Sequence, residues 1–269
     1  MGINRLKAEW PAPASVQAFT LTRAGGMSAA PFLSMNFATH VGDCPDHIQA
    51  NRTHLYETLK LDFPHLKFQW LNQIHGCDVS VNPDCVQVKE ADAIYFNEGN
   101  KVAVVQTADC VPIFLCSESG DEVALIHAGW RGLLGDVLGG MFGHVSSDVI
   151  TNTMAKFSCP RNKILAHIGP AICSQHYWVG EDVKNNFIRK DPSHKKSFYP
   201  YKTAKSSEPQ NLWHFNLYAV AKQILRSSGV HAIYGAHYCT FEQSSLFYSV
   251  RKKTITGRNA HLIWINEPS

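Results

Sequence analysis

The chain has 269 residues, of which 45% are hydrophobic and 17% charged, and its formal net charge is only +3. This composition is typical of a globular protein and excludes a disordered or fibrous chain. Because Lys and Arg are scattered, nothing indicates nucleic-acid binding, and no apolar run reaches the roughly 18–20 residues of a membrane span. Residues 1–19 lack the apolar stretch of a secretory signal, so we expect a cytoplasmic protein with reduced cysteines.

Short apolar segments alternate with amphipathic ones along the chain, which indicates alternating strands and helices. In chain order the expected elements are a strand at Val16–Thr22, a helix at Ile48–Leu61, strands at Phe68–Leu71 and Val102–Thr107, a hairpin of Val111–Cys116 and Val123–His127, a helix at Leu133–His144, a strand at Ile164–Ile168, a helix at Leu217–Ser227, and strands at His231–Tyr234 and His261–Ile265. This order favours a single α/β domain over residues 1–269, a three-layer α/β/α sandwich on a mixed β-sheet. The hydrophilic stretch 190–210 is predicted to be a surface loop of that domain.

The predicted hairpin brings two chemical groups close together. A polar segment, 117–122, separates its apolar runs, as expected for a turn. With the turn centred between Glu118 and Ser119, Cys110 lies opposite His127, with Cβ atoms roughly 4.5–5.5 Å apart. A slip of one residue would turn the two side chains to opposite faces.

Three residues stand where apolar runs end in short loops, the places where a rigid sheet commonly presents chemical groups. They are His75, Cys110 and His127. Two imidazoles and a thiolate are a common ligand set of an open zinc site, with the fourth position left for water or substrate, and they would also bind copper. The alternative is structural: hydrogen-bonded histidines and a buried cysteine.

The predicted helix 48–61 carries an arginine on its apolar stripe. The stripe runs through Ile48, Leu55 and Leu59, and Arg52 occupies the position four residues after its start. A buried unpaired charge is very costly. Arg52 therefore either extends its charged end to solvent or pairs with a core carboxylate such as Asp43 or Asp92, or it lines the site and binds an anion such as phosphate.

Several motifs resemble, in order, those of the laccase-domain family, first described as multicopper polyphenol oxidases and now regarded as purine nucleoside phosphorylases that also deaminate adenosine. The matching stretches include Thr22–Ser28, His40–Asp43, Trp70–Gly76, Thr107–Pro112, His127–Gly132, Ile168–Ile172 and Thr256–Arg258. The resemblance covers nearly the whole chain. Cys173–Trp178 and Ser249–Lys252 depart from the family's pattern, which leaves substrate detail open.

The resemblance implies that His75, Cys110 and His127 are metal ligands of a zinc-dependent enzyme. Its implied reactions are phosphorolysis of adenosine, inosine and methylthioadenosine to free base and ribose 1-phosphate, and hydrolytic deamination of adenosine. Its implied partners are the nucleoside and phosphate. Asp109 is a candidate proton shuttle, although it equally could orient a ligand imidazole or cap the turn before Cys110.

Arg52 is the leading candidate to hold the phosphate, ahead of Arg23, Arg131 and His40. Two other functions remain open at this point. One is a copper polyphenol oxidase, for which a single trio of donors is too few. The other is a cysteine hydrolase that edits peptidoglycan precursors, with Cys110 as nucleophile and His127 as base.

Overall fold

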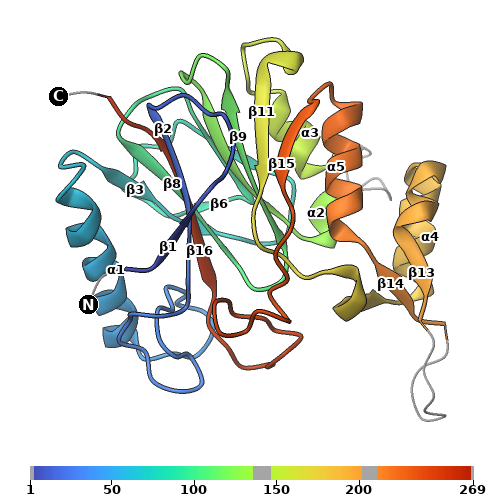
Figure 1. Ribbon diagram of the computed structural model, residues 1–269, viewed down its shortest axis with the longest axis horizontal. Helices are drawn as coiled ribbons and strands as arrows, with labels where there is room; N and C mark the ends of the chain where they lie inside the picture. Colours follow the sequence, from blue (N-terminus) through green and yellow to red (C-terminus); the bar gives the residue numbers. More distant parts are fainter. Residues whose placement is uncertain (1–2, 136–146, 202–210, 268–269) are drawn as a thin grey trace.

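Two mixed sheets pack face to face in the computed structural model, which describes residues 3–135, 147–201 and 211–267. Helices cover both outer faces: α1 lies on one side, and α2, α3, α4 and α5 lie on the other (Figure 1). The body therefore has four layers, in the order helix, sheet, sheet, helix.

The first sheet has five strands in the order β1-β2-β16-β8-β3. The bounds are β1 Arg5–Lys7, β2 Val16–Leu21, β16 Asn259–Ile265, β8 Lys101–Thr107 and β3 Lys67–Gln69. Its strands are antiparallel except for the parallel pair β3 and β8.

The second sheet has six strands in the order β15-β11-β9-β10-β7-β5. The bounds are β15 Ala232–Gly235, β11 Ile164–Ile168, β9 Val111–Ser117, β10 Val123–Ala128, β7 Ala93–Phe96 and β5 Val79–Val81. Its outer pairs are parallel and its central pairs antiparallel.

The remaining elements are short or helical. Two small sheets are formed by β12 Trp178–Val179, β14 Trp213–Phe215 and β13 Phe198–Pro200, and by β4 Leu71–Asn72 and β6 Lys89–Glu90. The α-helices are α1 Pro45–Lys60, α2 Trp130–Leu134, α3 Val149–Met154, α4 Glu181–Lys190 and α5 Leu217–Ser227, and the 3-10 helices are η1 Arg161–Lys163, η2 Ser174–His176 and η3 Pro192–Ser197. None of the described helices is long and apolar enough to cross a membrane.

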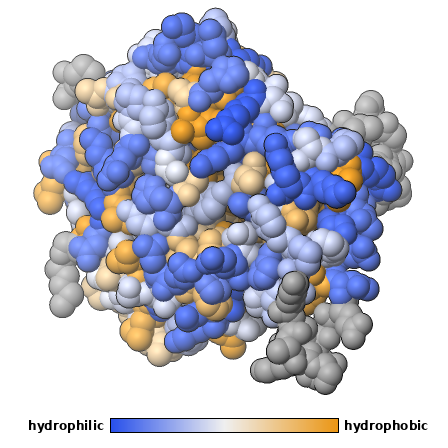
Figure 2. Space-filling model, turned by 45° about the vertical axis from the view of Figure 1, so that its right-hand side comes forward, coloured by the Kyte–Doolittle hydropathy of each residue, from blue (hydrophilic) through white to orange (hydrophobic). Residues whose placement is uncertain are grey.

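Three hydrophobic clusters hold the layers together. One lies between the two sheets and includes Val105, Phe114 and Ile263. The others lie under the helices, where Leu55 of α1 and Leu225 of α5 pack on opposite outer faces. Because every strand in the middle is covered on both sides, β9 and β10 are buried at every position, as expected for strands with no solvent face. On the face seen in Figure 2, hydrophobic residues are interspersed among hydrophilic ones.

The predicted α/β class and mixed strand directions are confirmed, but the three-layer sandwich on one sheet is wrong. The strands divide between two sheets that bury each other's inner faces. A strand buried on both faces has the same apolar pattern in either architecture, so the pattern could not distinguish them.

Two other expectations differ in detail. The stretch 190–210 includes η3 and β13, and its residues 202–210 lie outside the described part of the chain. Of the helix expected at Leu133–His144, only the start falls within the described residues, where α2 ends at Leu134.

The register of the hairpin also differs from the prediction. His127 pairs with Pro112 and Ala128 with Val111, so Cys110 lies before the first paired residue of β9 and not opposite His127. The partner of His127 is thus two residues farther along the chain than predicted. Because side chains alternate with a period of two, this shift keeps the expected face.

Candidate functional site

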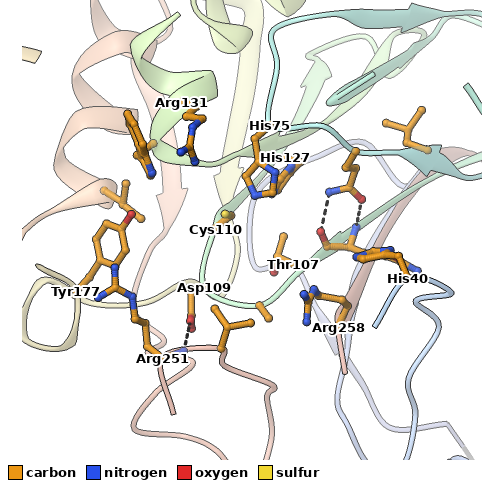
Figure 3. A pocket seen from close by; sticks show the side chains of 17 residues that line it. His40, His75, Thr107, Asp109, Cys110, His127, Arg131, Tyr177, Arg251 and Arg258 are labelled. Atoms are coloured by element: carbon orange, nitrogen blue, oxygen red, sulfur yellow. Dashed lines mark hydrogen bonds between the residues drawn. The ribbon is translucent and has the colours of Figure 1, made fainter. Parts of the chain in front are cut away.

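A cavity of about 270 Å³ opens where the ends of β8 and β10 meet the start of β9 and of α2. Figure 3 shows the side chains that surround it. The lining residues are His40, Leu71, Gln73, His75, Gln106, Thr107, Ala108, Asp109, Cys110, His127, Trp130, Arg131, Tyr177, Leu217, Val250, Arg251 and Arg258.

The structure brings His75, Cys110 and His127 together at this cavity, and we call these three residues the trio. One ligand atom from each lies within 4.8 Å of the other two, and the two imidazole rings meet edge to face with centroids 4.7 Å apart. His127 is buried at the end of β10, Cys110 is half-buried before β9, and His75 is exposed in a left-handed turn with φ 60°. The trio thus has one anchored side and one accessible side.

Asp92 joins two of the three donor segments, those of His75 and His127. Its Oδ1 accepts from Nδ1 of His127 at 2.8 Å and from the amide of His75 at 3.0 Å, and its Oδ2 accepts from the amide of Gly76 at 2.6 Å. Burial opposes ionisation of Asp92, but these hydrogen bonds outweigh it and keep its pKa below the usual value.

Because a carboxylate only accepts, Nδ1 of His127 carries a proton toward Asp92, which leaves Nε2 as the nitrogen available to a metal. From the sequence alone, Asp92 is expected only as a partner of Arg52. Its position immediately before a buried strand was the available signal for a site residue.

The electrostatics of the trio favour a thiolate. Burial alone would raise the pKa of Cys110, but His127 and His75 reverse the effect and bring it to about 6. Burial likewise would lower the pKa of His127, yet Cys110 and Asp92 raise it to about 9. In the metal-free protein the pair is therefore a thiolate beside an imidazolium. A thiolate and two imidazole nitrogens fit zinc or copper. Metal binding would displace the proton that His127 carries toward Cys110.

Gly129 makes the close approach of the trio possible. A Cβ at this position would lie 3.0 Å from Cδ2 of His75 and 3.1 Å from Sγ of Cys110. Both contacts are tighter than nearly all real Cβ contacts. The motif His127–Gly132 thus supplies both a donor and the space in which the other two fit.

Asp109 lines the cavity but does not contact the imidazoles through its carboxylate. Its Oδ1 accepts from Oγ1 of Thr240 at 2.7 Å, and its Oδ2 accepts from the amide of Arg251 at 2.9 Å. Asp109 is buried and adopts a left-handed φ of 101°. It therefore ties the turn before Cys110 to the segment 240–251.

Arg52 is not among the residues that line the cavity. It donates to the carbonyl of Phe37 at 2.9 Å and stacks on Trp70, with 4.1 Å between the guanidinium carbon and the ring centroid. Asn51, not Arg52, is fully buried on this side of α1. The structure therefore does not bring Arg52 together with the trio, and no hydrogen bond to Asp43 or Asp92 accompanies it among the described contacts.

Two other arginines and a histidine lie around the trio instead. In Figure 3 Arg131 lies on one side of Cys110, while Arg258 and His40 lie on the other. Arg258 is half-buried and donates to the carbonyls of Thr256 and Gly257 at 3.1 Å. From the sequence alone, Arg131 and His40 are weaker candidates than Arg52, and Arg258 is not a candidate although it stands in the motif Thr256–Arg258.

Arg251 lies farther along the same wall. Its guanidinium stacks on Tyr177, 4.7 Å from the ring centroid, and donates to the carbonyl of Trp178 at 3.1 Å. Burial raises the pKa of Tyr177, so its phenol stays protonated. Tyr177, with Arg251 stacked on it, gives the cavity one flat aromatic wall.

The fold and the site define an α/β protein whose three-donor site opens into a cavity that fits a small molecule. The chain belongs to the family described as multi-copper polyphenol oxidoreductase laccase, which it matches over residues 17–266. The resemblance seen in its motifs is therefore confirmed.

Relatives extend over almost the whole chain. A purine nucleoside phosphorylase of Haemophilus influenzae is 39% identical over 262 residues, which cover 97% of this chain and 99% of that protein. Purine nucleoside phosphorylase YfiH of Escherichia coli is 36% identical over 258 residues, covering 96% and 97%. The crystal structure of Neisseria meningitidis protein NMB0706 has a TM-score of 0.85 at 36% identity, covering 98% of this chain and 100% of that one.

Proposed function

We propose that the protein is a purine nucleoside phosphorylase that cleaves adenosine, inosine and methylthioadenosine with inorganic phosphate, and that it also deaminates adenosine. The observation that carries the proposal is the near full-length similarity to purine nucleoside phosphorylases, at 39% and 36% identity. The chemistry of the cavity supports it independently.

Phosphorolysis needs an anion held beside the ribose. An oxygen of hydrogen phosphate forms a bond to C1′ while the C1′–N9 bond breaks, and the electron pair leaves with the purine, which takes up the proton that the phosphate gives up. Arg258 and Arg131 stand on opposite sides of the trio and both line the cavity. Guanidinium groups bind phosphate through paired hydrogen bonds. We therefore assign phosphate binding to Arg258 and Arg131, and not to Arg52.

The purine needs a flat apolar surface and a hydrogen-bond donor for the departing base. Tyr177, Trp130 and Leu217 supply apolar and aromatic surface in the cavity. Burial, Arg258 and His75 lower the pKa of His40, so its imidazole is neutral at pH 7 and does not compete with Arg258 for phosphate. We assign His40 to hydrogen bonding with the departing base.

His75, Cys110 and His127 are the residues that would hold a zinc ion, or copper in its place. When bound, zinc would lower the pKa of a water in its fourth position toward about 7, which is the chemistry that deamination requires. In the overall reaction adenosine and water give inosine and ammonia. For Asp109 to move a proton in it, the carboxylate would have to give up one of its hydrogen bonds, to Thr240 or to Arg251.

A second candidate function is a cysteine hydrolase, and one observation favours it. In the metal-free protein Cys110 has its pKa lowered to about 6 beside His127, as in an activated nucleophile–base pair. A metal on Cys110 would suppress this nucleophilicity, so metal content separates the two functions. Oxidation of phenols, which the family description names, requires copper.

The deciding experiment is chromatography of adenosine incubated with the zinc-loaded protein, with and without phosphate. Adenine that forms only with phosphate, or inosine that forms in both conditions, supports the proposal. The Cys110→Ala variant should lose turnover, whereas Cys159→Ala, a cysteine outside the cavity lining, should retain it. Untouched adenosine with zinc bound would contradict the nucleoside function.

A further inference from the structure

A second group of three donor residues lies outside the cavity lining. Cys173, His176 and Glu242 offer a sulfur, a nitrogen and an oxygen within 4.8 Å of one another. Nε2 of His176 lies 3.0 Å from Oε1 of Glu242, and Sγ of Cys173 lies 4.0 Å from the same oxygen. None of the three takes part in the proposed reaction.

The backbone places the first two donors on one side. Cys173 is the residue before the 3-10 helix η2, and His176 is its last residue. A 3-10 helix has three residues per turn, so side chains three positions apart project in the same direction. Cys173–His176 is therefore a locally preformed pair.

The third donor comes from a turn that is fixed against this helix. The amide of Thr240 donates to the carbonyl of Ala171 at 3.1 Å, and the amide of Cys173 donates to Sγ of Cys239 at 3.4 Å. The ring of His176 stacks on Phe241, with centroids 4.2 Å apart. The segments 171–176 and 239–242 thus hold the donors in place without a metal.

Two of the three donor–donor separations are known, and both are close to those of a tetrahedral zinc site. For usual zinc bond lengths, ligand atoms of this kind are separated by roughly 3.4–3.6 Å. The observed separations are 3.0 and 4.0 Å. Both involve Oε1 of Glu242, which is exposed, so a small rotation of this side chain would bring them closer to the expected values.

We propose that Cys173, His176 and Glu242 form a second zinc site, which clamps η2 to the turn at 239–242. The segments that it joins both lead into the cavity wall: Tyr177 follows His176, and Thr240 holds Asp109. Zinc at this site would stabilise the wall without entering the cavity. An ordinary ion pair between His176 and Glu242 is the competing explanation, and it needs no cysteine.

The test is a titration with Co²⁺, whose bond to a thiolate gives a near-ultraviolet absorption band. In the Cys110→Ala protein, which lacks the thiolate of the trio, the band should persist. It should vanish in Cys110→Ala/Cys173→Ala and survive in Cys110→Ala/Cys159→Ala. Cys159 is a matched control because it is half-buried and also lies beside a glutamate, Glu122. Absence of the band from Cys110→Ala, or its survival without Cys173, would overturn the proposal.

Zinc content provides a second measurement that does not require the Cys110→Ala protein to fold. The wild-type protein and Cys159→Ala should each hold one zinc more than Cys173→Ala. Glu242→Gln keeps the hydrogen bond to His176 but loses the charge, and it should weaken zinc binding at this site by more than tenfold. Equal zinc content in Cys173→Ala and wild type would overturn the proposal, whatever the trio binds.

Discussion

Asp92 and His127 form a buried pair in which Nδ1 of the imidazole donates to the carboxylate at 2.8 Å. The same carboxylate accepts the amides of His75 and Gly76. One side chain thus fixes both the tautomer of one donor and the backbone of another. The geometry of the trio therefore depends on Asp92 as well as on the donors themselves.

Asp92→Asn should weaken zinc binding at the trio by about 10–100-fold, the usual cost of losing such a partner. The amide lacks the charge and one acceptor, so the loop at His75 loses its anchor. Competition with a chromophoric chelator measures the affinity. Asp43→Asn changes another buried aspartate, one that bonds Asn36, and should leave zinc affinity intact. An affinity unchanged by Asp92→Asn would refute this role.

Gly129→Ala should disrupt the trio while the sheets remain folded. The added methyl group meets His75 and Cys110 at 3.0 and 3.1 Å, so at least one donor must move. We expect zinc affinity and turnover to fall at least tenfold with little change in the far-ultraviolet circular dichroism. Gly76→Ala is the control in the same site, because its Cβ would meet no atom closer than 3.4 Å. Equal effects of the two changes would mean that crowding is not the cause.

Removal of the metal should make Cys110 reactive. Its pKa of about 6 means that the thiolate predominates above that pH, so alkylation by iodoacetamide should rise with a midpoint near 6 in the metal-free protein. Burial raises the pKa of Cys77 and Cys159 to about 11, so they should react slowly at pH 7. Zinc should protect Cys110, as peptide mass spectrometry would detect. Labelling that is insensitive to zinc would count against Cys110 as a ligand.

Arg258→Gln should raise the KM for phosphate by roughly 10–100-fold, because a hydrogen bond to a charged group contributes about 1.5–3 kcal/mol. Steady-state phosphorolysis of inosine measures it. Arg52→Gln is the informative comparison, since Arg52 stacks on Trp70 away from the cavity. If only Arg52→Gln raised the KM for phosphate, Arg52 and not Arg258 would be the residue that binds phosphate.

His167 should make the fold sensitive to acid. Burial, and secondarily His237, lowers its pKa in the folded state from 6.5 to about 4. The unfolded chain therefore takes up a proton as pH falls below about 6.5 while the folded chain does not. Stability is lost between about pH 6.5 and 4, by up to roughly 1.4 kcal/mol per pH unit for this group.

His167→Leu and His167→Gln should both flatten this dependence, as urea denaturation at several pH values would measure. Nδ1 of His167 is buried without a partner among the described residues, so the leucine should not destabilise the protein at pH 7. A wild-type slope in both variants would assign the acid sensitivity to other groups.

The sequence by itself determined the elements with strong local patterns. The helix predicted at Leu217–Ser227 matches α5 and the strand at Ile164–Ile168 matches β11, residue for residue. The three candidate donors that the structure brings together also stand out in the sequence, because each ends an apolar run beside a loop. Local pattern suffices for such features, since hydrophobic periodicity and strand ends are properties of short segments.

Tertiary structure decided the hairpin register, the division into two sheets, and the partners of Asp92, Asp109 and Arg52. β9 and β10 are buried on both faces, so no alternation of polar and apolar residues fixes their pairing. A charged side chain on a helix likewise does not reveal whether a carboxylate, a carbonyl or an indole will face it. Those contacts join residues far apart in the chain, and only the packing of complete layers selects among them.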